Sequence, residues 1–188
     1  MKARARAAEE TARRILDATL TLFKQRAYDH ITLQDVADLA GVSLQTVLRR
    51  FGSKEGLIAT LMEHDHGGFR TQRDQVPPGD LAAIVRVLVA QYEEYGDAII
   101  RNLNLEERFP EVRAMLAYGR TAHREWVAQA FASFLPSPDA DAYDRRLALF
   151  IAATDVYLWK LLRRDHGLDA EETERAMREL LDSLIAAP

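Results

Sequence analysis

Apolar residues recur at helical spacing along most of the chain. The first stripe lies in residues 10–25, and later stripes lie in residues 80–99, 110–134, 139–164 and 169–185. Each follows the i, i+3, i+4, i+7 pattern of an amphipathic helix, and no segment alternates with the period of two that marks a strand. The pattern therefore predicts an all-α fold.

The segment from residue 32 to residue 57 combines three short helices with tight turns. Thr32, Ser43 and Ser53 are of the residue type that caps helix N-termini. Gly41 stands where a helix ends in the left-handed backbone conformation. Two short helices joined in this way are typical of a helix-turn-helix, which presents its second helix to the DNA major groove.

The second helix of this motif carries polar side chains suited to DNA. Gln45 can form two hydrogen bonds with adenine, and Leu44 can contact a thymine methyl group. Lys54 adds positive charge to the free N–H groups at the start of the next helix. A plain three-helix bundle with a solvated polar helix is the alternative. The candidate DNA contacts are Thr32, Ser43, Leu44, Gln45, Thr46, Arg49, Arg50 and Lys54.

Charge and turn residues divide the chain into two parts. Residues 1–54 hold 10 basic and 6 acidic residues, a charge of +4, so the remainder of this chain of net charge −4 carries −8. A basic first part indicates that only this part meets a polyanion. Val76-Pro77-Pro78-Gly79 then breaks the helical pattern. The expected organisation is a DNA-binding domain with a connecting fourth helix in residues 1–66, a linker in residues 67–79 and a second helical domain in residues 80–188.

Several classes of protein are excluded or disfavoured. The chain has no cysteine, which rules out disulfides and cysteine metal sites and is consistent with a reducing cytoplasm. It has no apolar run of about 18 residues, and its N-terminus lacks the apolar core of a signal peptide. No glycine-rich phosphate loop or nucleophile–base set is present, so neither an enzyme nor a cofactor is expected. His64 and His66 point to different faces of a helix, which disfavours a metal site.

The later helices carry polar residues inside apolar stripes. Asp155 interrupts an apolar run, and His123 shares a stripe with Trp126. Small ligands bind in apolar cavities that contain a few such polar groups. A satisfied core histidine and a structural ion pair are the alternatives for His123 and Asp155. The candidate effector contacts are Tyr92, Tyr95, Asn102, His123, Trp126, Asp155 and Trp159.

The last helix has a continuous apolar stripe that must be covered. Its cover is either the rest of the same subunit or a second copy of the chain. The stripe consists of Met177, Leu180, Leu181, Leu184 and Ile185.

The motif residues resemble the N-terminal domain of the TetR (tetracycline-repressor-like) family. The matching elements are Ile15-Leu16-Asp17-Ala18, Phe23, Val36-Ala37, Ala40-Gly41-Val42-Ser43, Thr46, Phe51 and Ser53-Lys54-Glu55-x-Leu57. The resemblance implies a homodimer whose N-terminal domains bind operator DNA and whose C-terminal domains dimerise and bind a small effector. It also implies that the last two helices of each subunit form the dimer interface. A regulator without an effector, and an activator in place of a repressor, remain open.

Three positions depart from the family's usual pattern. Leu48 stands where a tyrosine typically lies against a phosphate, and losing that hydrogen bond is expected to weaken DNA contact by about 1 kcal/mol. Arg49 or Arg50 is available to compensate. Ala27 replaces a common turn glycine, and Ile31 replaces a common threonine.

Overall fold

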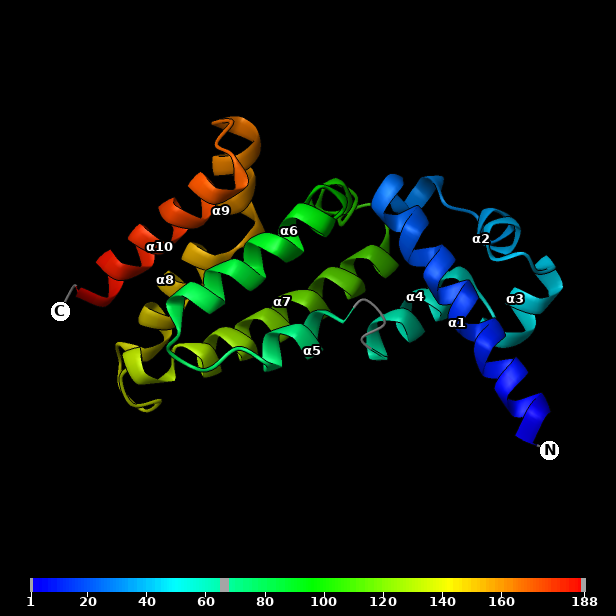
Figure 1. The fold of residues 1–188 in the computed structure, drawn as a ribbon, viewed down its shortest axis with the longest axis horizontal. Coiled ribbons are helices and arrows are strands. Elements are labelled where there is room, and N and C mark those ends of the chain that lie inside the picture. The colour runs from blue at the N-terminus through cyan, green and yellow to red at the C-terminus, as the bar shows by residue number, and fades with distance from the viewer. Residues whose placement is uncertain (1, 65–67, 187–188) are drawn as a thin grey trace. The chain divides into compact units, whose positions relative to one another are not determined.

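The computed structural model describes residues 2–64 and 68–186, without the side chains of residues 2–4. Every regular element in these ranges is helical, which confirms the predicted all-α fold. The helices form two compact units (Figure 1). The first unit comprises Met1–Phe69 and Arg101–Met115, and the second comprises Arg70–Ile100 and Leu116–Pro188.

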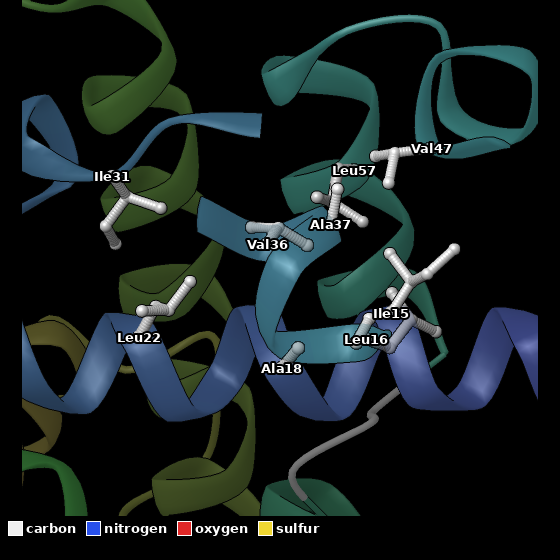
Figure 2. Close-up of a cluster of buried hydrophobic side chains, with 10 residues drawn as sticks. Ile15, Leu16, Ala18, Leu22, Ile31, Val36, Ala37, Val47 and Leu57 are labelled. Carbon is white, nitrogen blue, oxygen red and sulfur yellow. The ribbon is translucent and has the colours of Figure 1, made fainter. Parts of the chain in front are cut away.

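The first unit is built around a helix-turn-helix. Its elements are α1 (Lys2–Gln25), the 3-10 turn η1 (Tyr28–His30), α2 (Leu33–Ala40), α3 (Leu44–Phe51) and α4 (Lys54–Glu63). The apolar stripe of α1 faces side chains from α2, α3 and α4, as Figure 2 shows. The core consists of Ile15, Leu16, Ala18, Leu22, Ile31, Val36, Ala37, Ala40, Val47 and Leu57.

The helix boundaries of the first unit follow from the capping residues expected from the sequence. Thr32 caps α2 in a reciprocal capping box with Asp35, which satisfies two N–H groups that the helix leaves free. Gly41 ends α2 with φ 64° and ψ 41°, a conformation that costs glycine little. The Oγ atoms of Ser43 and Ser53 each accept an N–H from the first turn of the following helix at 3.2 Å. The predicted turn chemistry is therefore confirmed.

The second unit contains most of the remaining helices. Two long helices, α6 and α7, contribute to both units, because residues 101–103 of α6 and 110–115 of α7 lie in the first. None of the described helices is both long and apolar enough to cross a membrane. The elements are α5 (Phe69–Asp74), α6 (Leu81–Leu103), α7 (Pro110–Ala130), η2 (Ala132–Phe134), α8 (Tyr143–Thr154), α9 (Val156–Lys160), the π-helical turn η3 (Leu161–Asp165) and α10 (Ala170–Ala186).

Two long stretches differ from the sequence-based expectation. Residues 67–79 were expected to be a linker, yet α5 forms inside them. The helix expected over residues 139–164 begins only at Tyr143 and is interrupted at Asp155, whose backbone is extended at φ −78° and ψ 153°. The Asp155 carboxylate accepts the N–H of Tyr157 at 2.9 Å and so caps α9. A capping aspartate thus ends one helix and starts the next.

The two ends of the predicted first domain also differ. α1 begins at Lys2 and not near Glu10, so the basic N-terminal residues belong to a helix. α4 ends at Glu63, whereas we expected it to reach His66, a residue outside the described ranges. Residues 101–115, which the sequence assigned to the second domain, pack in the first unit.

Candidate nucleic-acid interface and buried polar cluster

α3 has one face fixed in the core of the first unit. Val47 is fully buried, and Leu44 and Phe51 are partly buried against the same cluster. These residues recur at helical spacing, so they fix the rotation of α3 about its axis. The opposite face is therefore held outward.

The outward face of α3 carries Gln45, Leu48 and Arg49. All three side chains are exposed, and their i, i+3, i+4 spacing puts them side by side. Gln45 and Arg49 form no hydrogen bond or ion pair with the described residues. Glutamine amides and arginine guanidinium groups are the side chains that form paired hydrogen bonds with adenine and guanine. This face has the chemistry needed to read base edges.

The candidate hydroxyl groups order the helix starts. Thr32 Oγ1 donates to Asp35 Oδ2 at 2.6 Å. This hydrogen bond is the largest cause of the lowered pKa of the Asp35 carboxyl. The Oγ atoms of Ser43 and Thr46 lie 2.9 Å apart at the first turn of α3. Thr32 and Ser43 are exposed and Thr46 is half-buried, so these hydroxyls combine a capping role with access to the surface.

Leu44 and Arg50 are placed differently from the sequence-based expectation. Leu44 packs partly against the core, which reduces the surface that it offers to a thymine methyl group. Leu48 is the apolar side chain that α3 exposes, at 38% of its surface. Arg50 is half-buried, and its Nε is buried without a hydrogen-bond partner among the described residues. Arg49 is the more accessible of the two arginines.

Lys54 is not the exposed cation that the sequence suggested. Its Nζ donates to the carbonyl oxygens of Tyr28, at 2.7 Å, and Ile31, at 2.8 Å. It also lies 3.7 Å from the centre of the Tyr28 ring. The sequence could not show this, because the partners lie more than 20 residues away along the chain.

A cluster of polar side chains lies inside the second unit. Arg73 Nη1 donates to His123 Nδ1 at 3.0 Å, and Arg73 Nε donates to Gln91 Oε1 at 2.8 Å. Trp126 donates its indole N–H to the Arg73 carbonyl at 3.2 Å, with the guanidinium 4.9 Å from the indole ring. Buried polar groups held in such a network specify one arrangement of the helices. The network joins α5, α6 and α7.

The hydrogen bonds of His123 define its tautomer. Because arginine has only donors, Nδ1 must accept, and Nε2 carries the proton that faces Thr154 Oγ1 at 3.2 Å. Burial, followed by the positive charge of Arg73, lowers the pKa of His123 to about 3. Tyr92 donates its hydroxyl proton to the Thr154 carbonyl at 2.8 Å, and burial raises the pKa of Tyr92 to about 12. Both groups are neutral over the ordinary pH range.

His123 should make the stability of the second unit depend on pH. Its folded-state pKa of about 3 lies below the unfolded value of 6.5, so the unfolded chain binds the proton more readily between these values. The free energy of unfolding should then fall by up to about 1.4 kcal/mol per pH unit as the pH drops from 6.5 towards 3. Urea unfolding over this window should show a shallower pH dependence for His123→Gln. His30→Gln, at an exposed histidine, is the control, and an unaltered slope in His123→Gln would mean that folded His123 accepts the proton.

The remaining candidate effector residues do not all lie together. Asn102 lies in the first unit, where its Oδ1 accepts the N–H of Tyr28 at 3.1 Å. Trp159 is fully buried and donates its indole N–H to Glu93 at 2.9 Å. Tyr95 is buried, and burial, the largest cause, raises its pKa to about 12. Asp155 is half-buried at the start of α9, and burial raises the pKa of its carboxyl. Only some of the candidates therefore share the cluster around His123.

Two residues with central positions were missed by the sequence reasoning. Arg73 lies in the segment expected to be a linker, so its contacts with α6 and α7 had no local signal. Tyr28 precedes the helix-turn-helix and contacts three segments of the first unit. The only signal for Tyr28 was an isolated aromatic residue in an otherwise polar stretch.

The apolar stripe of α10 divides between two environments. Met177 and Leu181 are fully buried inside the subunit, whereas Leu180 is 41% exposed. Leu184 and Ile185 are half-buried. The alternative that the stripe packs within its own subunit thus holds for Met177 and Leu181. Among the described residues, no group of three or more His, Asp or Glu side chains is placed to hold a metal ion.

The sequence and the fold are both similar to those of known regulators. The family model of the bacterial regulatory proteins of the tetR family matches residues 15–61. The HTH-type transcriptional regulator YvkB of Bacillus subtilis is 34% identical over 92 residues, which cover 47% of this chain and 49% of YvkB. The regulator TtgR of Pseudomonas putida is 31% identical over 104 residues, which cover 52% of this chain and 49% of TtgR. The chain thus spans about half the length of these curated relatives.

Solved structures extend the similarity of the fold to nearly the whole chain. GusR of Salmonella enterica has a TM-score of 0.70 at 18% identity, over 94% of this chain and 96% of GusR. A TetR-family regulator from Rhodococcus sp. has a TM-score of 0.65 at 19% identity, over 94% of this chain and all of that one. At these identities the likeness concerns the fold alone. The match over residues 15–61 shows that this part of the chain is a domain of the tetR family of bacterial regulatory proteins, and the solved structures show that nearly the whole chain has the fold of such regulators.

Proposed function

We propose that the protein is a homodimeric, ligand-responsive regulator of transcription, most simply a repressor that a small molecule releases from a palindromic operator. The observation that carries this proposal is the outward face of α3. Gln45 and Arg49 are exposed on a helix whose rotation is fixed by buried Val47. The net charge of +4 over residues 1–54 supports attraction to the phosphate backbone.

Dimerisation is supported by an exposed apolar surface on α8 and α10, two helices that contact each other. Leu180 on α10 and Leu149 on α8 are 41% and 43% exposed. Ala148 and Ala152, also exposed, flank Leu149 on α8. Exposed apolar side chains on two neighbouring helices are the raw material of a protein interface. In a two-fold dimer, the two copies of α3 would have to match half-sites about 34 Å apart.

Control by a ligand is supported by the buried cluster around Arg73 and His123. Its guanidinium, imidazole and indole groups come from α5 and α7, with His123 and Trp126 buried, and a few polar groups of this kind are typical of a small-molecule site between helices. An effector that binds here would move α4 and change the distance between the two recognition helices. It must bind the released form more tightly, because equal affinity for both forms shifts nothing.

A regulator without a small-molecule effector is the second candidate. The observation that favours it is that His123, Tyr92 and Trp126 each have a hydrogen-bond partner inside the protein. Both candidates are non-enzymatic, as expected for a relative of transcription regulators. They differ in whether any small molecule releases the DNA.

Selection of bound duplexes from a random DNA library, with the purified protein at moderate salt, tests the proposal. Enrichment of a palindrome is expected, with half-sites about one helical turn apart. Screening small molecules for release of that duplex then separates the two candidates. Salt-sensitive binding without any enriched sequence would contradict a sequence-specific regulator.

Gln45→Ala should relax base preference at one position of each half-site. Loss of a paired hydrogen bond to adenine removes about 1–3 kcal/mol of discrimination against the wrong base. Binding to single-base variants of the selected operator measures this effect, and Gln75→Ala, at an exposed residue of the second unit, is the control. An unchanged variant profile would remove Gln45 from the base contacts.

A further inference from the structure

The ammonium group of Lys54 is enclosed by the protein itself. A lysine ammonium has three N–H donors. Two of them serve the carbonyl oxygens of Tyr28 and Ile31, and the group lies against the face of the Tyr28 ring, which attracts cations. These three contacts, which we call the Lys54 clamp, engage the donors that a DNA phosphate would need.

The surroundings of the clamp keep this charge in place. Burial lowers the pKa of Lys54, while the nearby carboxylates Glu55, Asp29 and Glu111 act in the opposite direction. A partly desolvated cation that is satisfied by fixed partners is costly to separate from them. Lys54 therefore has a strong preference for its position inside the first unit.

Tyr28, on which the clamp is built, is fixed from several sides. Its N–H donates to Asn102 Oδ1 at 3.1 Å, and its hydroxyl donates to Glu55 Oε1 at 3.3 Å. Its ring meets Phe109 in an edge-to-face arrangement with 5.9 Å between the ring centres. Lys54 thus binds a rigid element of the first unit and not a loose loop.

The two ends of the helix-turn-helix meet at the clamp. Ile31 immediately precedes Thr32, the N-cap of α2, and Lys54 is the first residue of α4. The chain between them contains α2 and α3. The bonds of Lys54 Nζ close this stretch into a loop, and closing the ends of a stretch of chain limits the positions of everything inside it.

We propose that Lys54 is a positioning residue, which holds α3 at the angle required for the operator by joining the start of α2 to the start of α4. This inference rests on the proposed DNA-binding function. It differs from a phosphate contact in a measurable way. Loss of a positioning contact weakens binding to the operator selectively, whereas loss of a phosphate contact weakens binding to every sequence.

Lys54→Met is the test, because methionine keeps much of the apolar stem and removes the ammonium group. Operator affinity should fall about tenfold, since two charge-assisted hydrogen bonds are lost. Affinity for random duplex DNA and the slope of log affinity against log salt should stay the same. Lys160→Met, at a lysine paired with Asp165 in the second unit, controls for the loss of one charge. Circular dichroism at the assay temperature checks that each variant is folded.

Two results would overturn the inference. A salt slope that is shallower by about 0.9, with weaker binding to all sequences, would make Lys54 a phosphate contact. Unchanged operator affinity in a folded variant would make the clamp merely structural. If the unmodified protein selects no operator at all, the proposed function fails first, and that outcome is separate from both of these.

Acylation of amines in the unmodified protein gives a second measurement that does not depend on a variant folding. The chain has four lysines, Lys2, Lys24, Lys54 and Lys160, so mass spectrometry resolves each one. The clamp predicts that Lys54 reacts slowly both with and without operator DNA. A Lys54 that reacts readily in the free protein and becomes protected by DNA would contradict the clamp.

Discussion

Leu180→Glu should separate the proposed dimer into folded monomers and abolish tight operator binding. Leu180 is 41% exposed on α10, so the glutamate is tolerated in the single subunit. At a two-fold interface the substitution occurs twice, and each carboxylate would lose water without gaining a partner. Linked half-site binding exceeds single-site binding by about 10²–10⁴-fold, so loss of the dimer should cost a factor of that order.

Light scattering and operator titration together measure this effect. Ala117→Glu places the same charge at an exposed position of α7 and should leave both the mass and the affinity unchanged. A Leu180→Glu protein that remains dimeric would place the interface elsewhere. Leu181→Glu cannot serve this purpose, because Leu181 is fully buried and its replacement would disrupt the subunit itself.

Trp159→Ala should destabilise the second unit by about 3–5 kcal/mol, the usual effect of removing a large buried aromatic side chain. Trp159 is fully buried, lies near Tyr92 with 6.0 Å between ring centres, and donates to Glu93. Its ring fills the space beside Gly96, where an added Cβ would lie 2.4 Å from Cζ3 of the indole. The surface of α6 at Gly96 and the indole ring of Trp159 are therefore matched in shape.

Chemical denaturation of Trp159→Ala and Trp159→Phe measures the effect, with the phenylalanine variant expected to lose less. Gly96→Ala should also be destabilising, although alanine is the better helix former, because the indole blocks the new methyl group. The double variant Gly96→Ala/Trp159→Ala should lose less free energy of unfolding than the two single variants lose in sum. Strict additivity would show that the two positions do not share this space.

The elements that the sequence predicted well depend on local chemistry. Thr32, Gly41, Ser43 and Ser53 act on N–H and C=O groups within a few residues, so their identity is sufficient to place a helix end. The outward face of α3 follows in the same way from the spacing of the apolar residues. Because each of these signals is local, the helix-turn-helix can be identified from the amino-acid sequence.

The features that the sequence did not predict depend on distant partners. The contact between Tyr28 and Asn102 joins residues 74 apart along the chain. Whether a lysine at the start of α4 meets solvent or a carbonyl group depends on where η1 lies, which no local pattern encodes. Asp155 shows a different limit, because one aspartate in an apolar run is compatible with either a buried carboxylate or a cap between two helices.

The shared ends of α6 and α7 constrain how this architecture can be recombined. A chimera that takes only residues 1–64 from this chain would leave behind Asn102 and Phe109, which contact the backbone and ring of Tyr28 in the first unit. In the exchanged part, the N–H of Tyr28 would then be unpaired and its ring uncovered, close to the helix-turn-helix. A transferable unit must carry residues 101–115 as well, so an exchange of DNA specificity between relatives requires three crossovers and not one.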